Sequence, residues 1–199
     1  MTSSQKDAPV PETSLLEVRL DRFDKSAGLD RGKPFWFEVL WYLVKMAFFL
    51  SAFPYPNSFR RRLLILFGAK IGTGFVIRPR VNIHMPWKLV IGDHCWIGDS
   101  CEFLNLDRIV IEDHTAIAHE VSLTTGNHDY KDHTMPYRNA PIRICRGCWL
   151  ASRVFIGPGV TVGEHCIVTA GSVVTRSVPP WKIVQGNPAE VIRSRVLTR

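Results

Sequence analysis

An aliphatic residue returns at every sixth position over much of this 199-residue chain. The stretch "VFIGPGVTVGEHCIVTAGSVVT", residues 154–175, places Ile156, Val162, Val168 and Val174 six residues apart. An α-helix repeats near 3.6 residues and a strand near 2, so a period of six belongs to neither element alone. The period predicts a structural repeat, and it limits the possible folds more than any other feature of the sequence.

The same register extends upstream in blocks that irregular segments separate. Large apolar residues hold the repeated position at Ile71, Ile77, Ile83, Ile91, Ile97, Phe103, Ile111, Ile117, Leu123, Ile144 and Leu150. Four residues later the side chain is small or β-branched with few exceptions: Val81, Cys95, Cys101, Thr115, Val121, Cys148, Val154, Val160, Cys166, Ser172 and Val178. One large and one small inward position in six residues describe stacked coils of short parallel strands. We therefore predict a mostly β fold, a parallel β-helix over residues 71–178.

The segments outside the repeat have other compositions. Residues 1–30 are polar and are expected to be flexible or draped over the body. Residues 31–70 predict an N-terminal helical segment, with an apolar run over 34–54 and a second short helix over 57–70. Glu38 and Lys45 in the run count against a membrane-spanning helix, so packing on the body and lying on a membrane surface both remain open. Residues 179–199 form a C-terminal extension.

Composition restricts the function classes. The net charge of +7 favours anionic partners, but the basic residues are spread along the coil without a recognition motif, which counts against nucleic acid. Residues 1–30 contain no secretory pattern, so we expect a cytoplasmic protein. Five cysteines, an odd number, argue against a disulfide framework. The "CRGC" pair, Cys145 and Cys148, is interpreted as structural, because Cys148 falls in an inward position.

The hexapeptides "IGDHCW", "IGDSCE", "IGPGVT" and "VGEHCI" resemble the repeat of the hexapeptide-repeat acyltransferases. Over residues 35–195, "LLILFGAKIGTGFVIRPRVNI", "TTGNHDY" and "QGNPAEVIRSR" resemble the acetyltransferases of colanic-acid-type exopolysaccharide synthesis, relatives of the galactoside and maltose O-acetyltransferases. The resemblance implies a left-handed β-helix, a homotrimer with active sites between adjacent solenoids, and acetyl-CoA as donor with no metal. It implies a sugar hydroxyl as acceptor.

A long insertion over residues 124–143 interrupts the coil and contains His128 and His133. Long loops in a regular fold are often functional, and histidine suits proton transfer near neutral pH. "IAHEVSLTTGNH" matches the family pattern that ends on the catalytic histidine, so the resemblance implies His128 as general base. His133 is the fallback, and Asp129 is a weaker candidate for orienting the imidazole.

The resemblance also implies binding residues. For coenzyme A these are Trp149, Ser152, Ala170, Thr175, Arg176 and Arg193, where small residues admit the pantetheine and cationic residues meet the phosphates. For the sugar, Asn105 matches a family asparagine. Trp87, in "MPWKL", is expected either to pack on a sugar face or to plug the end of a turn.

Two other functions remain as alternatives. His114 and His119 have the H-x4-H spacing of the γ-class carbonic anhydrases, which use zinc, although His94, His114 and His165 share one place in the repeat and are expected to be exposed corner residues. A non-catalytic scaffold is the second alternative. If the apolar run lies on lipid, the enzyme would be peripheral to the inner membrane, beside a lipid-linked acceptor.

Overall fold

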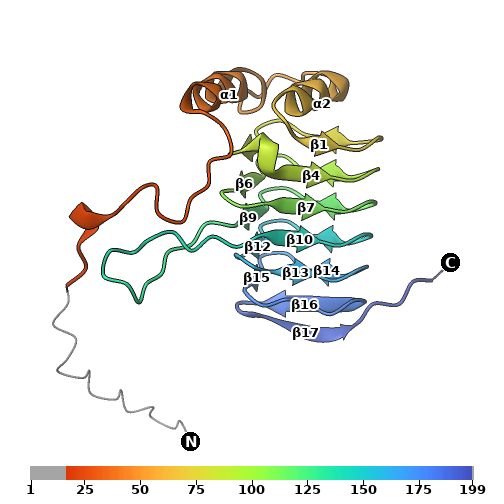
Figure 1. Ribbon diagram of the computed structural model, residues 1–199. Coiled ribbons are helices and arrows are strands. Elements are labelled where there is room, and N and C mark those ends of the chain that lie inside the picture. The colour runs from red at the N-terminus through yellow and green to blue at the C-terminus, as the bar shows by residue number, and fades with distance from the viewer. Residues whose placement is uncertain (1–16, 199) are drawn as a thin grey trace, which may run out of the picture.

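The chain folds as a parallel β-solenoid with two helices at its N-terminal end (Figure 1). The computed structural model describes residues 17–198. The predicted flexible segment over residues 1–30 therefore lies partly outside the described residues. Each coil contributes one short strand to each of three sheets, which confirms the predicted mostly β fold.

Three sheets, here named A, B and C, form the sides of the solenoid, and their strands pair in parallel except for the antiparallel β16–β17 pair at the end of sheet B. Sheet A contains β1 (Lys70–Ile71), β4 (Leu89–Ile91), β7 (Ile109–Ile111), β10 (Ile142–Ile144) and β13 (Thr161–Val162). Sheet B contains β2 (Val76–Ile77), β5 (Trp96–Ile97), β8 (Ala116–Ile117), β11 (Trp149–Leu150), β14 (Ile167–Val168), β16 (Lys182–Gly186) and β17 (Ala189–Ser194). Sheet C contains β3 (Asn82–Ile83), β6 (Glu102–Leu104), β9 (Ser122–Thr124), β12 (Phe155–Ile156) and β15 (Val173–Val174).

The six-residue period is the period of this core. Every residue that we assigned to the large or the small inward position is buried. Neighbouring coils pair in register, so that Ile77 lies over Ile97 and Ile97 over Ile117. The corners need a left-handed backbone, and His94, His114 and His165 adopt φ of 55, 56 and 55°. The predicted corner positions of these three histidines are confirmed.

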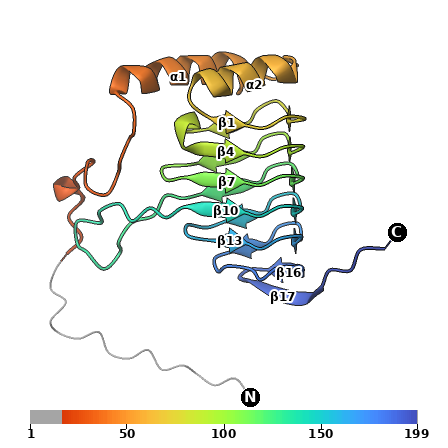
Figure 2. The ribbon, with the colours of Figure 1, turned by 45° about the vertical axis from the view of Figure 1, so that its right-hand side comes forward.

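Two helices cover the first coil, and a hairpin closes the other end (Figure 2). The helix α1 (Phe35–Phe48) follows Pro34, and α2 (Asn57–Leu66) follows Pro56. The indole of Trp41 donates to the carbonyl of Ile83 at 2.9 Å, which ties α1 to the coil below it. Two short 3₁₀ turns, η1 (Leu20–Arg22) and η2 (Pro86–Lys88), lie outside these helices. Within residues 17–198, no helix has the length and apolar character that crossing a bilayer requires.

The three sequence interruptions all fall at one corner of the solenoid. Residues 84–88, 105–108 and 125–141 each connect a strand of sheet C to the next strand of sheet A. This corner is opposite sheet B in a three-sided section. The longest interruption, residues 125–141, projects from the coil as a narrow arm (Figures 1 and 2). We call it the corner loop.

Candidate active site

The corner loop consists of two antiparallel arms that hold His128 away from the coil. Backbone bonds join its two arms, from Arg138 N to Asn127 O at 2.8 Å and from Asp129 N to the carbonyl of Pro136 at 2.9 Å. His128 and Tyr137 form an antiparallel bridge between the arms. The loop is therefore an ordered support for the histidine.

The tautomer of the neutral His128 ring follows from its hydrogen bond. Its Nδ1 lies 2.6 Å from the carbonyl oxygen of Met135. A carbonyl oxygen only accepts hydrogen bonds, so Nδ1 carries the proton and Nε2 of the neutral ring keeps its lone pair. Met135 has φ of 49°, a left-handed backbone at the turn that presents this carbonyl. Such an arrangement prepares Nε2 to accept a proton.

The two other polar side chains predicted near His128 have different contacts. A carboxylate oxygen of Asp129 accepts the backbone N–H of Lys131 at 3.1 Å, so this side chain caps a turn. The ring of His133 lies 3.6 Å from the carboxylate of Asp132. The group that holds the His128 ring is the Met135 carbonyl, which sequence reasoning missed because any residue type supplies a carbonyl.

An N-terminal segment packs along the corner loop. Residues 17–33, here named the strap, place the Phe23 ring 5.6 Å from the His128 ring and 5.2 Å from the Tyr137 ring. Arg19 N donates to the carbonyl of His133 at 2.9 Å. Gly28 has φ of 78°, and a Cβ there would lie 2.3 Å from the Tyr137 carbonyl oxygen. Residues 17–30 thus lie on the insertion and form part of the support of His128, a role that the sequence did not predict.

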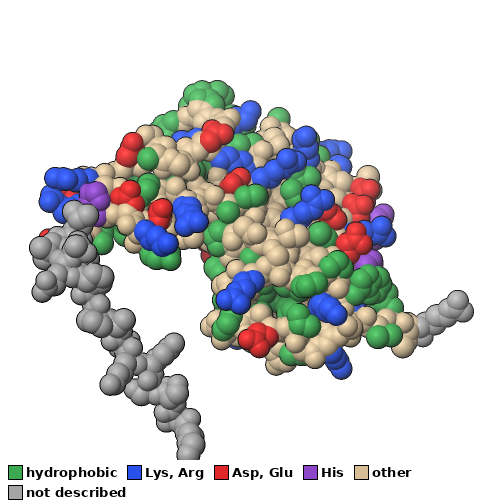
Figure 3. Space-filling model, turned by 60° about the horizontal axis from the view of Figure 1, so that its bottom comes forward, with side chains coloured by type: hydrophobic (Ala, Val, Ile, Leu, Met, Phe, Trp, Pro, Cys, Tyr) green, Lys and Arg blue, Asp and Glu red, His purple; other side chains and the backbone are tan. Residues whose placement is uncertain are grey.

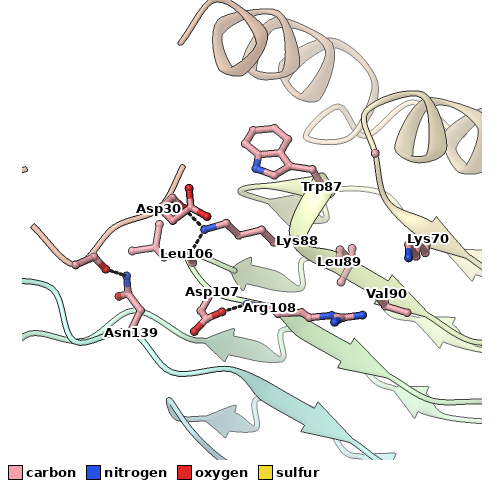
Figure 4. A pocket seen from close by; sticks show the side chains of 12 residues that line it. Asp30, Lys70, Trp87, Lys88, Leu89, Val90, Leu106, Asp107, Arg108 and Asn139 are labelled. Atoms are coloured by element: carbon pink, nitrogen blue, oxygen red, sulfur yellow. Dashed lines mark hydrogen bonds between the residues drawn. The ribbon is translucent and has the colours of Figure 1, made fainter. Parts of the chain in front are cut away.

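A cavity of about 440 Å³ lies between the strap and the corner (Figure 4). Three cationic residues line it, Lys70, Lys88 and Arg108, together with Asp30 and Asn139. The Lys88 ammonium donates to the carbonyls of Asp30 and Leu106, which joins the strap to the coil. Asn139 belongs to the corner loop, so the cavity adjoins the arm that carries His128.

Trp87 stands at the edge of this cavity and is held on both sides. Its indole N–H donates to the carbonyl of Arg31 at 2.7 Å, and its ring packs edge-on against Phe37 at 5.6 Å. Of the two roles expected for Trp87, these contacts match the structural one.

Asn105 has a structural task that the sequence did not indicate. It is 0% exposed, and its carboxamide accepts from the Met85 N–H at 2.8 Å and donates to the Met85 carbonyl at 2.6 Å. These two hydrogen bonds take the place of strand pairing between residues 84–88 and 105–108, the first two interruptions, which lie on neighbouring coils. The predicted sugar contact needs correction, because the side chain has no accessible surface and its amide is used by Met85.

The residues predicted to bind coenzyme A lie at separate places on one chain. Ser152 and Ala170 stack at the corner between sheets B and C, where Gly171 N donates to the Ser152 carbonyl at 2.9 Å. Thr175 and Arg176 follow β15 and so lie at the other end of sheet C. Arg193, on β17, pairs with Ile183. Two copies of the chain would have to adjoin for one groove to contain both groups.

Trp149 projects from sheet B beside a second cavity, of about 540 Å³. Ala116 pairs with both Trp96 and Trp149, so the two indoles stand on either side of an alanine. Trp96 is 63% exposed and Trp149 is 48% exposed. Since sheet B is opposite the corner loop, His128 and Trp149 of the same chain face different directions. Figure 3 shows the molecule with its hairpin end brought forward, where hydrophobic and basic side chains are interspersed with a few acidic ones.

The histidines of the zinc alternative do not converge. His114 stacks on His94 with ring centroids 5.2 Å apart, and Nδ1 of His119 accepts the backbone N–H of Asp99 at 3.0 Å. Within the described part of the chain, no three His, Cys, Asp or Glu side chains form a group that could hold a metal ion. Both histidines are instead explained by the corner geometry.

Comparison with known proteins agrees with this geometry. Residues 141–176 match the model of the bacterial transferase hexapeptide, six repeats. A putative colanic acid biosynthesis acetyltransferase of Escherichia coli is 43% identical over 159 residues, which cover 80% of this chain and 87% of the relative. The chain belongs to the hexapeptide-repeat acetyltransferases.

Solved structures of other acetyltransferases share the fold of this chain. A hexapeptide-repeat acetyltransferase of Vibrio cholerae, complexed with acetyl coenzyme A, superposes with a TM-score of 0.72 at 27% identity, covering 79% of this chain and 86% of the other. A galactoside acetyltransferase in complex with coenzyme A gives a TM-score of 0.71 at 26% identity, covering 78% and 79%. The predicted family, and with it the class of enzyme, an acyltransferase, is confirmed.

Proposed function

We propose that this acetyltransferase moves an acetyl group from acetyl-CoA to a sugar hydroxyl in the synthesis of a colanic-acid-like exopolysaccharide. The observation that carries the proposal is the His128 ring, whose Nδ1–H is fixed by the Met135 carbonyl so that Nε2 is the basic atom. The relative that acts in colanic acid synthesis supports the choice of acceptor class. The acceptor would be a nucleotide-linked or lipid-linked sugar of that pathway.

The proposed reaction needs one base and no covalent enzyme intermediate. Nε2 of His128 takes the proton of the sugar hydroxyl as its oxygen attacks the thioester carbonyl. The tetrahedral intermediate collapses, the carbon–sulfur bond breaks, and the coenzyme A thiolate leaves. The imidazolium then returns its proton to the thiolate, so that charge and protons balance. The Met135 carbonyl stabilises the imidazolium by accepting the Nδ1 proton throughout.

Acetyl-CoA would lie along a groove between two solenoids. Trp149, Ser152 and Ala170 would line one side, on the surface from sheet B to the adjoining corner, and Thr175, Arg176 and Arg193 would supply polar and cationic contacts for the phosphates. The pair Ser152 and Ala170 and the pair Thr175 and Arg176 lie at separate ends of sheet C, which supports a donor site shared by two copies.

A homotrimer would complete the active site. The corner loop leaves the coil opposite sheet B, so the His128 and the Trp149 that share a site would come from different chains. Three solenoids with parallel axes would place each corner loop against the sheet B of a neighbour. This arrangement agrees with the assembly that the family resemblance implies.

The test is acetyl-CoA binding and turnover by the wild type and His128→Asn. Calorimetric titration should give equal affinity for both proteins, since His128 acts on the acceptor. Release of free coenzyme A with a panel of nucleotide- and lipid-linked sugars should fall about 10²- to 10⁴-fold in the variant. His133→Asn is the matched control and should retain activity. Absence of acetyl-CoA binding in both proteins, or full turnover by His128→Asn, would refute the proposal.

A further inference from the structure

One face of α1 is apolar and faces solvent. Trp41 and Phe37 pack on the body from the opposite face of the helix. The exposed face carries seven large apolar side chains without an intervening charge: Phe35, Trp36, Val39, Leu40, Tyr42, Leu43 and Met46. Phe35 is 74% exposed and Leu43 is 61% exposed. Packing on the body and lying on a membrane surface were alternatives for residues 34–54. The helix packs on the body with one face and leaves the opposite, apolar face open.

The neighbouring segments enlarge this surface. Phe53 is 60% exposed after α1, and Ile65 and Leu66 are 42% and 73% exposed on α2. We call these ten residues the end platform. Both helices cap the first coil, and no other element of the described chain lies beyond them along the solenoid (Figures 1 and 2). Large apolar side chains exposed in this number at one end of the molecule mark an interaction site rather than ordinary surface.

Charge is distributed unevenly about the platform. Residues 31–92 contain ten Lys or Arg and a single acidic residue, Glu38. The rest of the chain has fifteen basic and seventeen acidic residues, so the net charge of +7 arises at this end. Lys33 and Arg62, next to the platform, are exposed. An apolar helix face with flanking cations is the pattern of helices that lie in the interface of anionic membranes.

We propose that the end platform docks on the surface of an anionic phospholipid bilayer. The helix α1 would lie flat, with its apolar face at the boundary between headgroups and acyl chains. Lys33 and Arg62 would meet lipid phosphates. The buried face of α1 stays on the first coil, so docking requires no unfolding.

Docking through the platform would bring the active-site corner close to a lipid-linked acceptor, an inference that rests on the proposed function. The solenoid axis would stand away from the bilayer, and the cavity lined by Lys70, Lys88 and Arg108 belongs to the coils nearest the platform. An acceptor sugar carried on a lipid by a phosphate linkage would reach this corner without leaving the membrane. In a trimer with parallel axes the three platforms would share one plane, which raises membrane affinity through multivalency.

Vesicle co-sedimentation tests the platform directly. The wild type should sediment with vesicles of phosphatidylcholine and phosphatidylglycerol, and less with phosphatidylcholine alone. Trp36→Glu combined with Leu43→Glu should abolish sedimentation, because two carboxylates would enter the apolar layer. Val196→Asp, at an exposed apolar residue on the C-terminal segment, is the matched control and should sediment like the wild type.

A charge-reversal variant distinguishes an anionic lipid surface from other binding partners of the platform. Arg62→Glu should weaken binding to the anionic vesicles by at least about fivefold, and added salt should reduce the difference. Arg146→Glu, an exposed cation far from the platform in sequence, should have little effect. Failure of the wild type to sediment, or equal sedimentation of all variants, would overturn the proposal. So would a larger assembly in light scattering that Leu43→Glu dissolves, since the platform would then bind a second copy.

These experiments can refute the membrane-docking proposal and the proposed function separately. Acetyl-CoA titration of the platform variants should match the wild type, because no platform residue lies among those proposed for the donor. Sedimentation without acetyl transfer would refute the proposed function and leave the platform standing.

Discussion

At the residue scale, the support of His128 depends on groups that no motif contains. A backbone carbonyl fixes the tautomer, and a phenyl ring from the strap covers the imidazole. His128 and Phe23 are 105 positions apart in the chain, so no local pattern connects them. Sequence comparison found the histidine because it lies in a motif, and structure was needed to find what holds it.

Truncating Phe23 should impair turnover more than donor binding. In Phe23→Ala the His128 ring loses one packing partner, and a displacement of a catalytic group by about 1 Å costs up to about 10²-fold in rate. We expect kcat to fall about tenfold or more with the KM for acetyl-CoA unchanged. Phe23→Tyr should restore kcat, and Leu20→Ala, exposed on the same strap, should have no effect. A parallel rise in KM without loss of kcat would contradict a positioning role.

The inward cysteines are small core residues, as the repeat predicted. Burial raises the pKa of the Cys101 thiol to about 11 and that of Cys148 to about 12. Each of these thiols donates to a backbone carbonyl of a neighbouring coil, Cys101 to Ala118 and Cys148 to Gly163. Thiols protected in this way are poor nucleophiles and poor metal ligands.

The raised pKa of Cys148 predicts a loss of stability in alkali. The unfolded thiol ionises near its ordinary pKa of 9.0, whereas the folded thiol stays neutral to about 12. Its contribution is complete below pH 9 and is lost as the pH rises toward 12. The urea midpoint should fall as the pH rises from 9.0 toward about 12, and by less in Cys148→Ala. An equal fall in both proteins would contradict this origin.

At the element scale, Arg60 joins the two helices to the coil. It is 1% exposed, and its guanidinium donates to the carbonyl oxygens of Phe48 at 3.1 Å, Phe53 at 2.9 Å and Ile77 at 3.4 Å. The three carbonyls belong to the end of α1, the connection between helices, and the first coil. The sequence "FRRRLL" does not distinguish Arg60 from its neighbours, because only the packing of α2 decides which arginine faces inward.

Replacing Arg60 should destabilise the capped end of the solenoid. Arg60→Ala removes a buried guanidinium that donates to three backbone carbonyls, and the unfolding free energy should fall by about 2–4 kcal/mol. Arg62→Ala, on the exposed side of the same helix, should change it by less than about 0.5 kcal/mol. Denaturant unfolding followed by circular dichroism measures both. Equal stability of the two variants would show that the guanidinium contacts contribute little.

At the scale of the whole molecule, the fold separates groups that the proposed chemistry needs together. The corner loop and sheet B lie on opposite sides of one solenoid, so a single chain holds His128, the proposed base, apart from the Trp149 surface. Light scattering should therefore give three times the mass of the chain. Mixing inactive His128→Asn with a variant inactive through Ser152→Trp should restore partial activity, because mixed trimers contain one intact shared site. No recovery on mixing would indicate that each chain holds a complete site.

The sequence by itself determined the coil, its inward residues and its family. A six-residue period repeats the same local environment in every turn, so the residue type at each position indicates whether that position is buried. It predicted His128 through a motif of the family. Only the tertiary structure decided what surrounds that histidine, the task of Asn105, and which face of α1 is open. These features join segments far apart in the chain, and their contacts depend on how the corner, the strap and the helices pack rather than on any pattern within one segment.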